Sequence, residues 1–394
     1  MAEWMDESLK DLKRRGLFRT RWRVKSALGA RLQIGGRTLL NFASNDYLGL
    51  ASDVRIAGAA ARAAMQYGSG AGASPLITGW TPPVRRLERA LARWEETESS
   101  LVFATGFAAN LGVIGSLAED GDAIFSDALN HASIIDGCRL SRALVHIYRH
   151  ADANHLNDLL RKHGGNARRR LIVSDSVFSM DGHIAPLADL LDLGRRHDCR
   201  LLIDEAHATG ILGENGRGAL ESLPEDERWI KVGTLSKALG AQGGFVCGSR
   251  LLTNWLVNRA RPYVFSTALA PPAAAAARQA LAIVIDEPER RRHLLALADF
   301  LRHQLRASDF GDGGSCCHIV PLIVGGAAQT VRLSRMLADR GFLVPAIRPP
   351  SVPVGTARLR ISLTAAHNED DVSQFVEALQ QCREHLRGKK HAHG

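Results

Sequence analysis

The stretch Leu201-Leu202-Ile203-Asp204-Glu205-Ala206-His207 decides the fold. The apolar run is typical of a strand buried on both faces. It ends in a carboxylate, and an imidazole follows three residues later. In open α/β sheets, ligands bind at the carboxyl ends of such strands. The stretch therefore predicts a mostly parallel sheet with a functional site where Asp204 and His207 follow the strand.

Six further short apolar runs surround this stretch and alternate with helical patterns. They are Leu101–Ala104, Ala123–Ser126, Leu144–Tyr148, Leu171–Ser174, Lys231–Thr234 and Gly244–Cys247. Several of them are continuous rather than alternating, which again indicates strands that helices cover on both faces. The sequence thus predicts an α/β fold with a mostly parallel central sheet.

The pattern differs on either side of this region, so we expect three parts. Residues 1–45 would form an N-terminal helical arm over Glu7–Arg23 and a hairpin around Gly35-Gly36. Residues 46–286 would form a large domain, and residues 287–394 a smaller α+β domain with a short antiparallel sheet. A chain of 394 residues is long enough for more than one domain.

Composition narrows the class of protein. A hydrophobic content of 45% and a charged content of 23% are ordinary for a globular protein. No apolar stretch is long enough to span a bilayer, and the N-terminus lacks the pattern of a secretory signal, so we expect a cytoplasmic protein without a membrane partner. The six cysteines show no CxxC spacing, which favours reduced thiols and no metal site.

The net charge of +9 bears on possible partners. No nucleic-acid-binding motif accompanies the positive charge, so nucleic acid is not an expected partner. A basic surface also suits a phosphate-rich substrate such as coenzyme A, or an acidic carrier protein.

Lys237 stands in the second informative stretch, Thr234-Leu235-Ser236-Lys237-Ala238-Leu239-Gly240. A single lysine is usually a solvated charge, but the neighbours of this one are small, apolar or hydroxylated. A lysine desolvated in such a pocket is a nucleophile. The hydroxyls of Thr234 and Ser236 suit a phosphate group.

Asp204 and His207 alone are equally compatible with a helix-capping aspartate and a core histidine. Lys237 decides between the two interpretations. Pyridoxal phosphate (PLP) needs an amine for covalent attachment and a carboxylate against its pyridine nitrogen, and Lys237 and Asp204 supply both. The combination therefore indicates PLP, with His207 near its phenolic oxygen.

Three further segments follow predicted strands. Thr105-Gly106-Phe107-Ala108-Ala109-Asn110 opens a helical run, and the backbone N–H groups of a helix N-terminus bind phosphate. His131 could stack on a flat cofactor ring, and Ser179 could hydrogen-bond the cofactor or orient His207. Alone, the first segment is a weak signal, because many strand-to-helix turns contain glycine. Without the other motifs a structural role would be favoured for His131, and Ser179 could merely cap the turn.

Arg348 is a candidate clamp for a substrate carboxylate, because a guanidinium and a carboxylate pair through two parallel hydrogen bonds. The following prolines stiffen its backbone, although an exposed loop arginine is the plain alternative. Gly68–Ser74 resembles a dinucleotide-binding loop. Because Ala57–Gln66 before it has a helical pattern rather than that of a strand, we reject NAD binding and expect a flexible loop near the substrate.

Taken together, these motifs resemble the α-oxoamine synthase family of fold-type I PLP enzymes over nearly the whole chain. The motifs that carry the resemblance are Asn45–Leu50, Gly106–Asn110, His131–Ser133, Phe178–Gly182, Asp204–Gly210, Thr234–Gly240 and Arg348–Arg360. Within the family, Ala346–Pro353 and Gly355–Arg360 are most similar to the member of the biotin pathway. The resemblance implies condensation of L-alanine with a pimeloyl thioester, carried by coenzyme A or an acyl carrier protein, with loss of carbon dioxide.

The resemblance also implies a role for each residue around the cofactor. Lys237 matches the lysine that binds PLP, Asp204 the partner of the pyridine nitrogen, and His131 the histidine that stacks on the ring. His207 and Ser179 match groups around the phenolic oxygen. Lys237, Asp204, His131 and His207 form the expected catalytic set.

The remaining matched residues bind phosphate or substrate. Those matched to the phosphate site are Gly106, Phe107, Thr234 and Ser236, with Thr267 contributed by a second subunit, so a homodimer with shared sites is expected. Those matched to the substrate site are Arg348, Asn45, Ser351 and Arg19, although Arg21 and Arg23 crowd the match for Arg19. Two departures stand out: Leu76 replaces a histidine of some members, and Ser351 replaces the commoner threonine but keeps a hydroxyl.

Three alternatives stay open. Another member of the family would use glycine or serine with a different acyl-CoA. An ordinary aminotransferase would use no thioester. A regulator with a PLP fold would need an added DNA-binding segment, and we see none in the sequence.

Overall fold

The computed structural model describes residues 3–391, and the side chains up to residue 385. The residues cluster into two compact units, each of which is described by itself. Unit 1 comprises Met1–Gly49, Met180–His183 and Arg292–Gly394, and unit 2 comprises Leu50–Ser179 and Ile184–Arg291. The predicted division at residues 45 and 286 stays a prediction.

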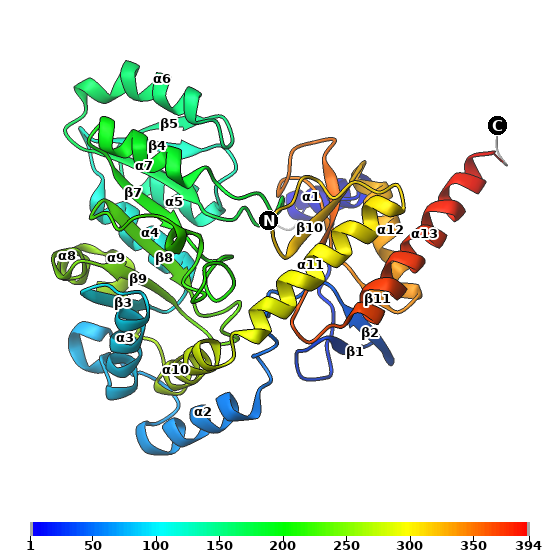
Figure 1. Ribbon diagram of the computed structural model, residues 1–394, viewed down its shortest axis with the longest axis horizontal. Coiled ribbons are helices and arrows are strands. Elements are labelled where there is room, and N and C mark those ends of the chain that lie inside the picture. Colours follow the sequence, from blue (N-terminus) through cyan, green and yellow to red (C-terminus); the bar gives the residue numbers. More distant parts are fainter. Residues whose placement is uncertain (1–2, 392–394) are drawn as a thin grey trace. The chain divides into compact units, whose positions relative to one another are not determined.

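Unit 2 is built around a seven-stranded sheet with the strand order β3-β9-β8-β7-β6-β4-β5 (Figure 1). The strands are β3 (Ser99–Phe103), β4 (Ala123–Asp127), β5 (Leu144–Tyr148), β6 (Arg170–Asp175), β7 (Arg200–Asp204), β8 (Trp229–Thr234) and β9 (Gly244–Gly248). β9 pairs antiparallel with β3 and with β8, whereas the remaining neighbours pair in parallel. The predicted mostly parallel α/β sheet is confirmed.

Helices cover both faces of this sheet. The α-helices that lie wholly within unit 2 are α2 (Val54–Tyr67), α3 (Pro82–Trp94), α4 (Gly106–Leu117), α5 (Ala132–Leu140), α6 (Ala153–His163), α7 (Leu187–Arg196), α8 (Arg250–Arg259), α9 (Arg261–Val264) and α10 (Pro271–Asp286). Within β7, Leu202 packs into the core with α4 and α5, whereas Leu201 and Ile203 pack into the core with α6 and α7. Successive side chains of a strand point to opposite faces, so a strand covered on both faces must be apolar throughout.

The polar ends of the parallel strands meet at one edge of the sheet. Asp175 closes β6 and lies opposite Asp204, which closes β7. Thr234 closes β8 beside them, and the segment after β4 leads to His131. This is the edge at which ligands bind in open α/β sheets.

Unit 1 contains two three-stranded sheets. Their strands are β1 (Arg31–Ile34), β2 (Arg37–Asn41) and β11 (Phe342–Leu343) in one, and β10 (Ile319–Gly325), β13 (Ala357–Ser362) and β12 (Ala346–Ile347) in the other. The second sheet is antiparallel, and β1 and β2 form a hairpin, which confirms both predictions.

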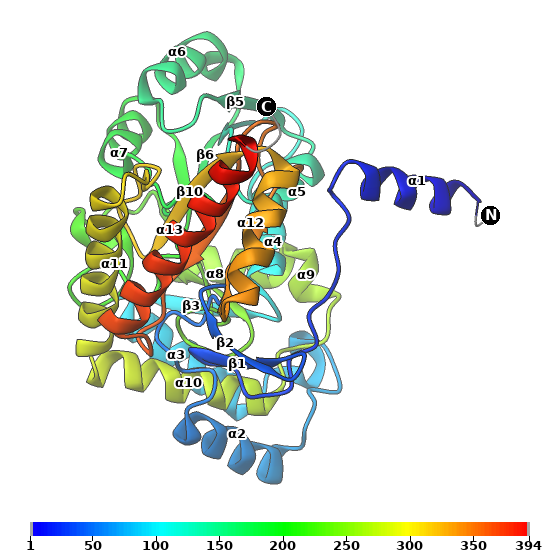
Figure 2. The same ribbon diagram turned by 90° about the vertical axis from the view of Figure 1, so that its right-hand side faces the viewer.

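The helices of unit 1 are α1 (Glu3–Arg14), α11 (Glu289–Ala307), which begins at the end of unit 2, α12 (Ala327–Asp339) and α13 (Glu369–His391), and Figure 2 shows α12 and α13 side by side. The prediction of a helix as far as Arg23 was wrong, because α1 ends at Arg14. Gly16 follows with a φ of +66°, and the N–H of Leu17 bonds back to the carbonyl of Leu12 at 2.8 Å. A glycine in this left-handed conformation is a common end of a helix.

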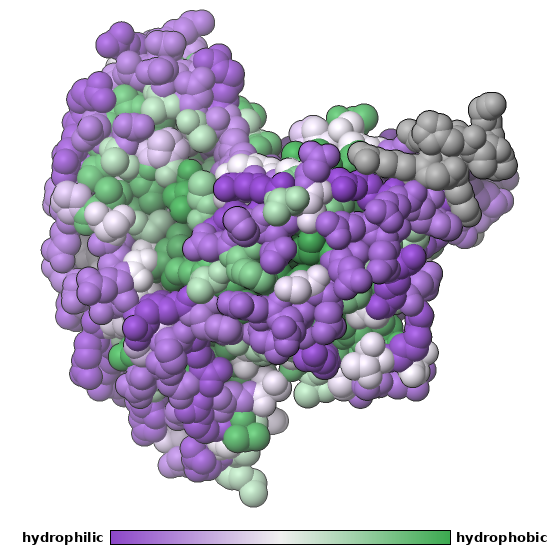
Figure 3. Space-filling model, turned by 45° about the vertical axis from the view of Figure 1, so that its right-hand side comes forward, coloured by the Kyte–Doolittle hydropathy of each residue, from purple (hydrophilic) through white to green (hydrophobic). Residues whose placement is uncertain are grey.

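On the face drawn in Figure 3, hydrophilic residues predominate, and hydrophobic residues gather on part of it. Among residues 3–391, no helix is both long enough and apolar enough to cross a membrane. All six cysteines are free, and only Cys316 among them is exposed.

Candidate active site

Lys237 lies just beyond the carboxyl end of β8 and is partly buried. Its Nζ atom is 2.8 Å from Nε2 of His207. The turn before Lys237 is fixed by Thr234, whose Oγ1 is 2.8 Å from Oγ of Ser236 and accepts the backbone N–H of Ser236 at 3.3 Å. The structure thus brings together the predicted lysine and the predicted imidazole.

Asp204 is held rigidly at the end of β7. Its side chain is 5% exposed, Oδ1 accepts the backbone N–H of Ala206 at 2.8 Å, and Oδ2 accepts Nδ2 of Asn110 at 2.6 Å. Two donors to one buried carboxylate set its orientation before any ligand binds. A carboxylate fixed in this way suits a cationic ring nitrogen better than a flexible one would.

His131 caps the N-terminus of α5. Its Nδ1 atom accepts the backbone N–H of Ser133 at 3.2 Å, and its own backbone N–H donates to Oδ2 of Asp175 at 2.7 Å. Desolvation lowers the pKa of the imidazole, although the residue as a whole is exposed. The charges of Asp204 and Lys237 act on the same imidazole in opposite directions, so both groups lie near this ring.

Asp175 is the second buried carboxyl group at this edge. Burial raises its pKa well above the usual range, and the neighbouring charge of Asp204 raises it further. The hydrogen bond from the backbone N–H of His131 acts in the opposite direction. Two carboxyl groups side by side at one sheet edge favour a bound cation or a shared proton.

The predicted phosphate site combines a helix N-terminus with hydroxyl groups. α4 begins at Gly106, and Thr105 caps it by accepting the backbone N–H of Ala108 at 3.0 Å. A Cβ atom on Gly106 would lie 3.3 Å from the side chain of Thr234, so the start of α4 approaches the end of β8 closely. Backbone N–H groups and the Thr234 hydroxyl therefore lie together in a place suited to a phosphate.

Phe107, Ser179 and Thr267 complete the predicted cofactor contacts. Phe107 is exposed, and its ring centroid lies 6.3 Å from that of His131, edge to face. Ser179 is partly buried in the segment after β6, and Thr267 is exposed beyond α9. The roles of Ser179 and Thr267 stay predictions.

The donor set at this edge fits PLP. An amine at Lys237, a fixed carboxylate at Asp204 and a glycine that admits close approach at the start of α4 match the aldehyde, the pyridine nitrogen and the phosphate of that cofactor. His131 adds an exposed aromatic ring near Asp204 and Lys237.

The predicted substrate residues of unit 1 form a second group. Nη2 of Arg348 donates to the carbonyl of Phe18 at 2.7 Å, and Nη1 donates to the carbonyl of Ala346 at 3.2 Å. Nη2 of Arg19 donates to Oγ of Ser351 at 3.3 Å. Burial lowers the pKa of Arg348, and the positive charge of Arg19 lowers it further. Two adjacent cations with few enclosed partners favour an anionic ligand.

Asn45 takes part in a separate set of hydrogen bonds in the same unit. It is exposed, and its Oδ1 atom accepts the hydroxyl of Tyr47 at 3.1 Å. That hydroxyl also accepts Nη2 of Arg360 at 3.1 Å. The structure joins Arg19, Arg348 and Ser351 as one group, whereas Asn45 lies in a separate hydrogen-bonded chain.

Sequence reasoning missed three buried residues at the cofactor edge, namely Asn110, Ser133 and Asp175. The first two were inside quoted motifs, but as neighbours of the residues that drew attention. Asp175 ends an apolar run just as Asp204 does, and that repetition was a signal that could have been used.

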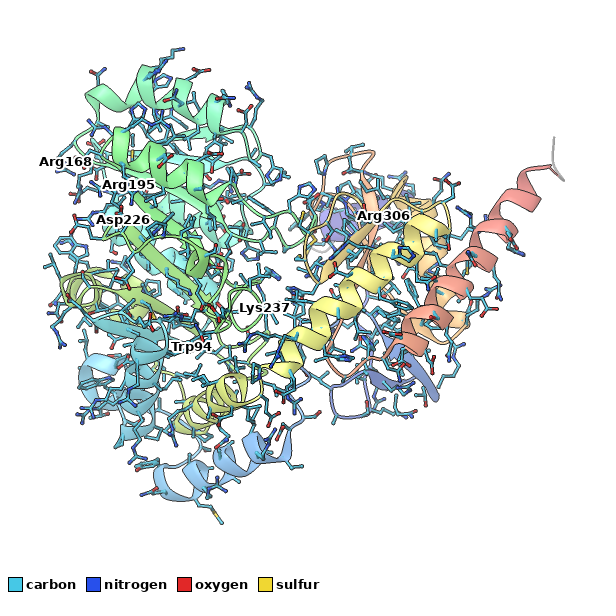
Figure 4. All side chains as sticks on the ribbon, viewed as in Figure 1. Trp94, Arg168, Arg195, Asp226, Lys237 and Arg306 are labelled. Carbon is cyan, nitrogen blue, oxygen red and sulfur yellow. The ribbon has the colours of Figure 1, made fainter. Side chains whose placement is uncertain are left out.

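A separate cavity of about 330 Å³ lies at the amino ends of the strands, away from Lys237. Figure 4 shows Arg168, Arg195 and Asp226 at that opposite edge of unit 2. Its lining is rich in arginine, and Arg168 pairs with the buried Asp122 at 3.1 Å. The lining therefore holds more arginines than acidic residues, and Asp122 balances part of that positive charge.

The aminotransferase class I and II family pattern matches residues 37–379. The 8-amino-7-oxononanoate synthase of Anaeromyxobacter dehalogenans strain 2CP-1 is 48% identical over 378 residues, which cover 96% of this chain and 94% of the relative. The enzyme of the same name from Anaeromyxobacter sp. strain Fw109-5 is 51% identical over 380 residues, with 96% and 95% covered. Among solved structures, a lysine-to-alanine variant of serine palmitoyltransferase from S. paucimobilis with a bound PLP–myriocin aldimine has a TM-score of 0.92 at 29% identity, with 98% of both chains covered.

Proposed function

We propose that this chain, which belongs to the class I and II aminotransferase family and within it to the α-oxoamine synthases, is an 8-amino-7-oxononanoate synthase. It condenses L-alanine with a pimeloyl thioester. The products are 8-amino-7-oxononanoate, carbon dioxide and the free thiol. This reaction is a step of biotin biosynthesis.

One observation on the site supports the proposed reaction. The amine of Lys237 contacts His207, and the fixed carboxylate of Asp204 acts electrostatically on the same His131 ring as that amine. The identity of about half of all residues with 8-amino-7-oxononanoate synthases, over nearly the full length of both chains, supports the choice of substrates.

In this proposal, Lys237 binds PLP covalently and Asp204 pairs with its pyridine nitrogen. The N-terminus of α4, Thr234 and Ser236 bind its phosphate, and His131 stacks on its ring. When bound, PLP supplies an electron-withdrawing ring that stabilises negative charge on the α-carbon of an amino acid.

The chain's own groups then select and activate the substrates. Arg348 binds the carboxylate of L-alanine through its guanidinium, and Arg19 and Ser351 supply further donors for substrate oxygens. Nζ of Lys237, once released from covalent attachment, accepts the proton of the α-carbon, because an amine held at that position is a suitable general base. Holding both substrates at one site removes most of the entropic cost of their encounter.

The proposal extends to assembly and location. Thr267 of the partner subunit contributes to the phosphate site, so the active form is a homodimer in the cytoplasm. The acyl donor is a thioester of coenzyme A or of an acyl carrier protein, and the net charge of +9 favours either anionic carrier. An apparent affinity for the acyl donor that does not weaken as ionic strength rises would contradict this role of charge.

The direct test is a matched comparison of amino acids. Purified protein loaded with PLP is mixed with pimeloyl-CoA and L-alanine, glycine or L-serine, and the product and free thiol are quantified by mass spectrometry and a thiol reagent. We expect 8-amino-7-oxononanoate from L-alanine, with thiol released in equal amount. Preference for glycine or serine would assign the chain to another α-oxoamine synthase activity, and conversion of alanine to pyruvate without thiol release would indicate an aminotransferase.

A further inference from the structure

We infer that Asn110 and Ser133 are positioning residues that hold His131 as the neutral tautomer with its proton on Nε2, in a fixed relation to Asp204. The assignment of a role beside the cofactor rests on the proposed function. The hydrogen bonds themselves belong to the chain and are present before any ligand binds.

The tautomer follows from the donors that face Nδ1 of His131. The backbone N–H of Ser133 lies 3.2 Å from this atom, and a backbone N–H can only donate. Nδ1 must therefore carry a lone pair rather than a proton. The ring is then neutral, and its single proton is on Nε2.

The hydroxyl of Ser133 strengthens this assignment. Its Oγ atom lies 2.7 Å from Nδ1 of His131 and 2.9 Å from Nδ2 of Asn110. The amide nitrogen of Asn110 donates to that oxygen, which leaves the hydroxyl proton free to point at Nδ1. Two donors thus converge on one ring nitrogen.

Asn110 connects this arrangement to Asp204. The same Nδ2 atom lies 2.6 Å from Oδ2 of Asp204. A carboxylate oxygen only accepts, so the amide of Asn110 cannot be turned round without setting two acceptors against each other. Asn110 therefore points one N–H at Asp204 and the other at Ser133, and both donors are committed.

Burial makes the arrangement specific. Asn110 and Ser133 are each 1% exposed, on α4 and on the first turn of α5, which pack against each other. In such surroundings a hydrogen-bonded chain is strongly oriented, and loss of one member leaves the others unsatisfied. His131 itself is exposed, and no side chain described among residues 3–385 hydrogen-bonds its Nε2 atom.

As a consequence, the site contains an uncharged, flat ring whose one N–H donor is on Nε2. A protonated ring would add a second positive charge near Lys237. The charged groups that act on the ring are Asp204, Lys237 and Asp136, and Asp175 holds its backbone. Among the residues that the structure describes, Ser133 is the one that hydrogen-bonds Nδ1, so it fixes which nitrogen carries the proton.

The test measures the imidazole directly, so it does not depend on turnover. Protein labelled with ¹⁵N at histidine is titrated by NMR without and with PLP, and the His131 signals are assigned by their loss in His131→Phe. We expect the Nε2–H tautomer in the wild type. Ser133→Ala should raise the pKa of His131 by about half to one unit, because the lost hydrogen bond stabilised the neutral ring.

Two further variants keep the test informative. Ser141→Ala removes another buried hydroxyl at the far end of α5, which donates to the carbonyl of Cys138 at 2.6 Å, and it should leave His131 unchanged. Ser133→Cys keeps the shape with a weaker donor and should give an intermediate pKa, which serves if Ser133→Ala does not fold. In the loaded enzyme, Ser133→Ala should lower kcat about fivefold with little change in KM.

The inference would be overturned by a wild-type His131 with its proton on Nδ1, or by a Ser133→Ala protein whose His131 titrates as in the wild type. A chain that failed to condense alanine with a pimeloyl thioester would contradict the proposed function instead, and the NMR result would still stand.

Discussion

Two pairs of like ionisable groups distinguish the two units of this protein. At the sheet edge of unit 2, Asp175 and Asp204 are both at most 5% exposed and are fixed by hydrogen bonds from the backbone and from Asn110. In unit 1, Arg348 is partly buried and donates to the carbonyls of Phe18 and Ala346, whereas Arg19 is exposed and donates to the hydroxyl of Ser351.

The difference shows how each pair is expected to act. A buried, fully fixed pair sets the chemistry of a bound cation and strains the fold when both members ionise. A more exposed pair is screened by solvent and acts mainly by attracting an anionic ligand. Changes in unit 2 should therefore alter kcat and the pH dependence of stability, and changes in unit 1 should alter KM.

The largest expected effect is that of Lys237→Ala. Removal of the amine abolishes covalent attachment of PLP and the general base, so kcat should fall about a thousandfold or more. Condensation of alanine with pimeloyl-CoA measures the loss, and Lys162→Ala on the exposed face of α6 is the matched control. Wild-type turnover in Lys237→Ala would show that the Lys237 site of unit 2 takes no part in the reaction.

Asp204→Asn should have the next largest effect. It removes the negative charge that keeps the pyridine nitrogen protonated and sets an amide against that of Asn110, so kcat should fall about a hundredfold while KM for alanine changes little. Steady-state kinetics beside the exposed control Asp189→Asn will measure both constants. A rise in KM without a fall in kcat would contradict the expectation that changes in unit 2 alter kcat and changes in unit 1 alter KM.

Arg348→Lys tests the arginine pair of unit 1. A lysine keeps the charge but cannot form the two parallel hydrogen bonds to a carboxylate, so KM for alanine should rise about tenfold with kcat nearly preserved. Arg335→Lys, which changes another arginine whose charge acts on Arg348, is the control and should leave KM close to wild type. A loss of kcat without a change in KM would show that Arg348 does not serve substrate binding.

The smallest effect concerns the stability of the buried carboxyl pair. The pKa of Asp175 is raised in the folded state, so the folded state holds this proton more tightly than the unfolded state does. Stability that is present below the unfolded pKa of about 4 is lost as pH rises towards the folded pKa. Asp175→Asn lacks this loss, and its thermal midpoint should gain a few degrees on wild type between pH 4 and pH 7.

Differential scanning fluorimetry across that pH range will measure this gain. Asp136→Asn, at a partly exposed position of α5, should follow the wild-type curve. A difference between Asp175→Asn and wild type that shrinks as pH rises would mean that Asp175 is stabilised as an anion.

The sheet and its functional edge could be predicted because local sequence determines them. Leu201, Leu202 and Ile203 must be apolar in any strand with two covered faces, and Asp204 marks the point where the apolar run ends. Lys237 stood out because its neighbours are too small and apolar for a surface charge. These features need no knowledge of distant contacts.

The hydrogen-bonded chain through Asn110 and Ser133 could not be predicted in this way. It depends on how α4 packs on α5, which side-chain patterns do not specify. The choice of Arg19 beside Ser351 likewise depends on the path of the chain after α1, and that helix ended nine residues before its predicted limit because of Gly16.

The measurement that tests the account most directly is the position of the cofactor on the chain. PLP-loaded protein is reduced with borohydride, which makes the bond between cofactor and lysine permanent, and the labelled peptide is identified by mass spectrometry. We predict a single label on Lys237. A label on Lys231, which lies six residues earlier and pairs with Glu95 at 2.5 Å, or no stable label at all, would contradict the account.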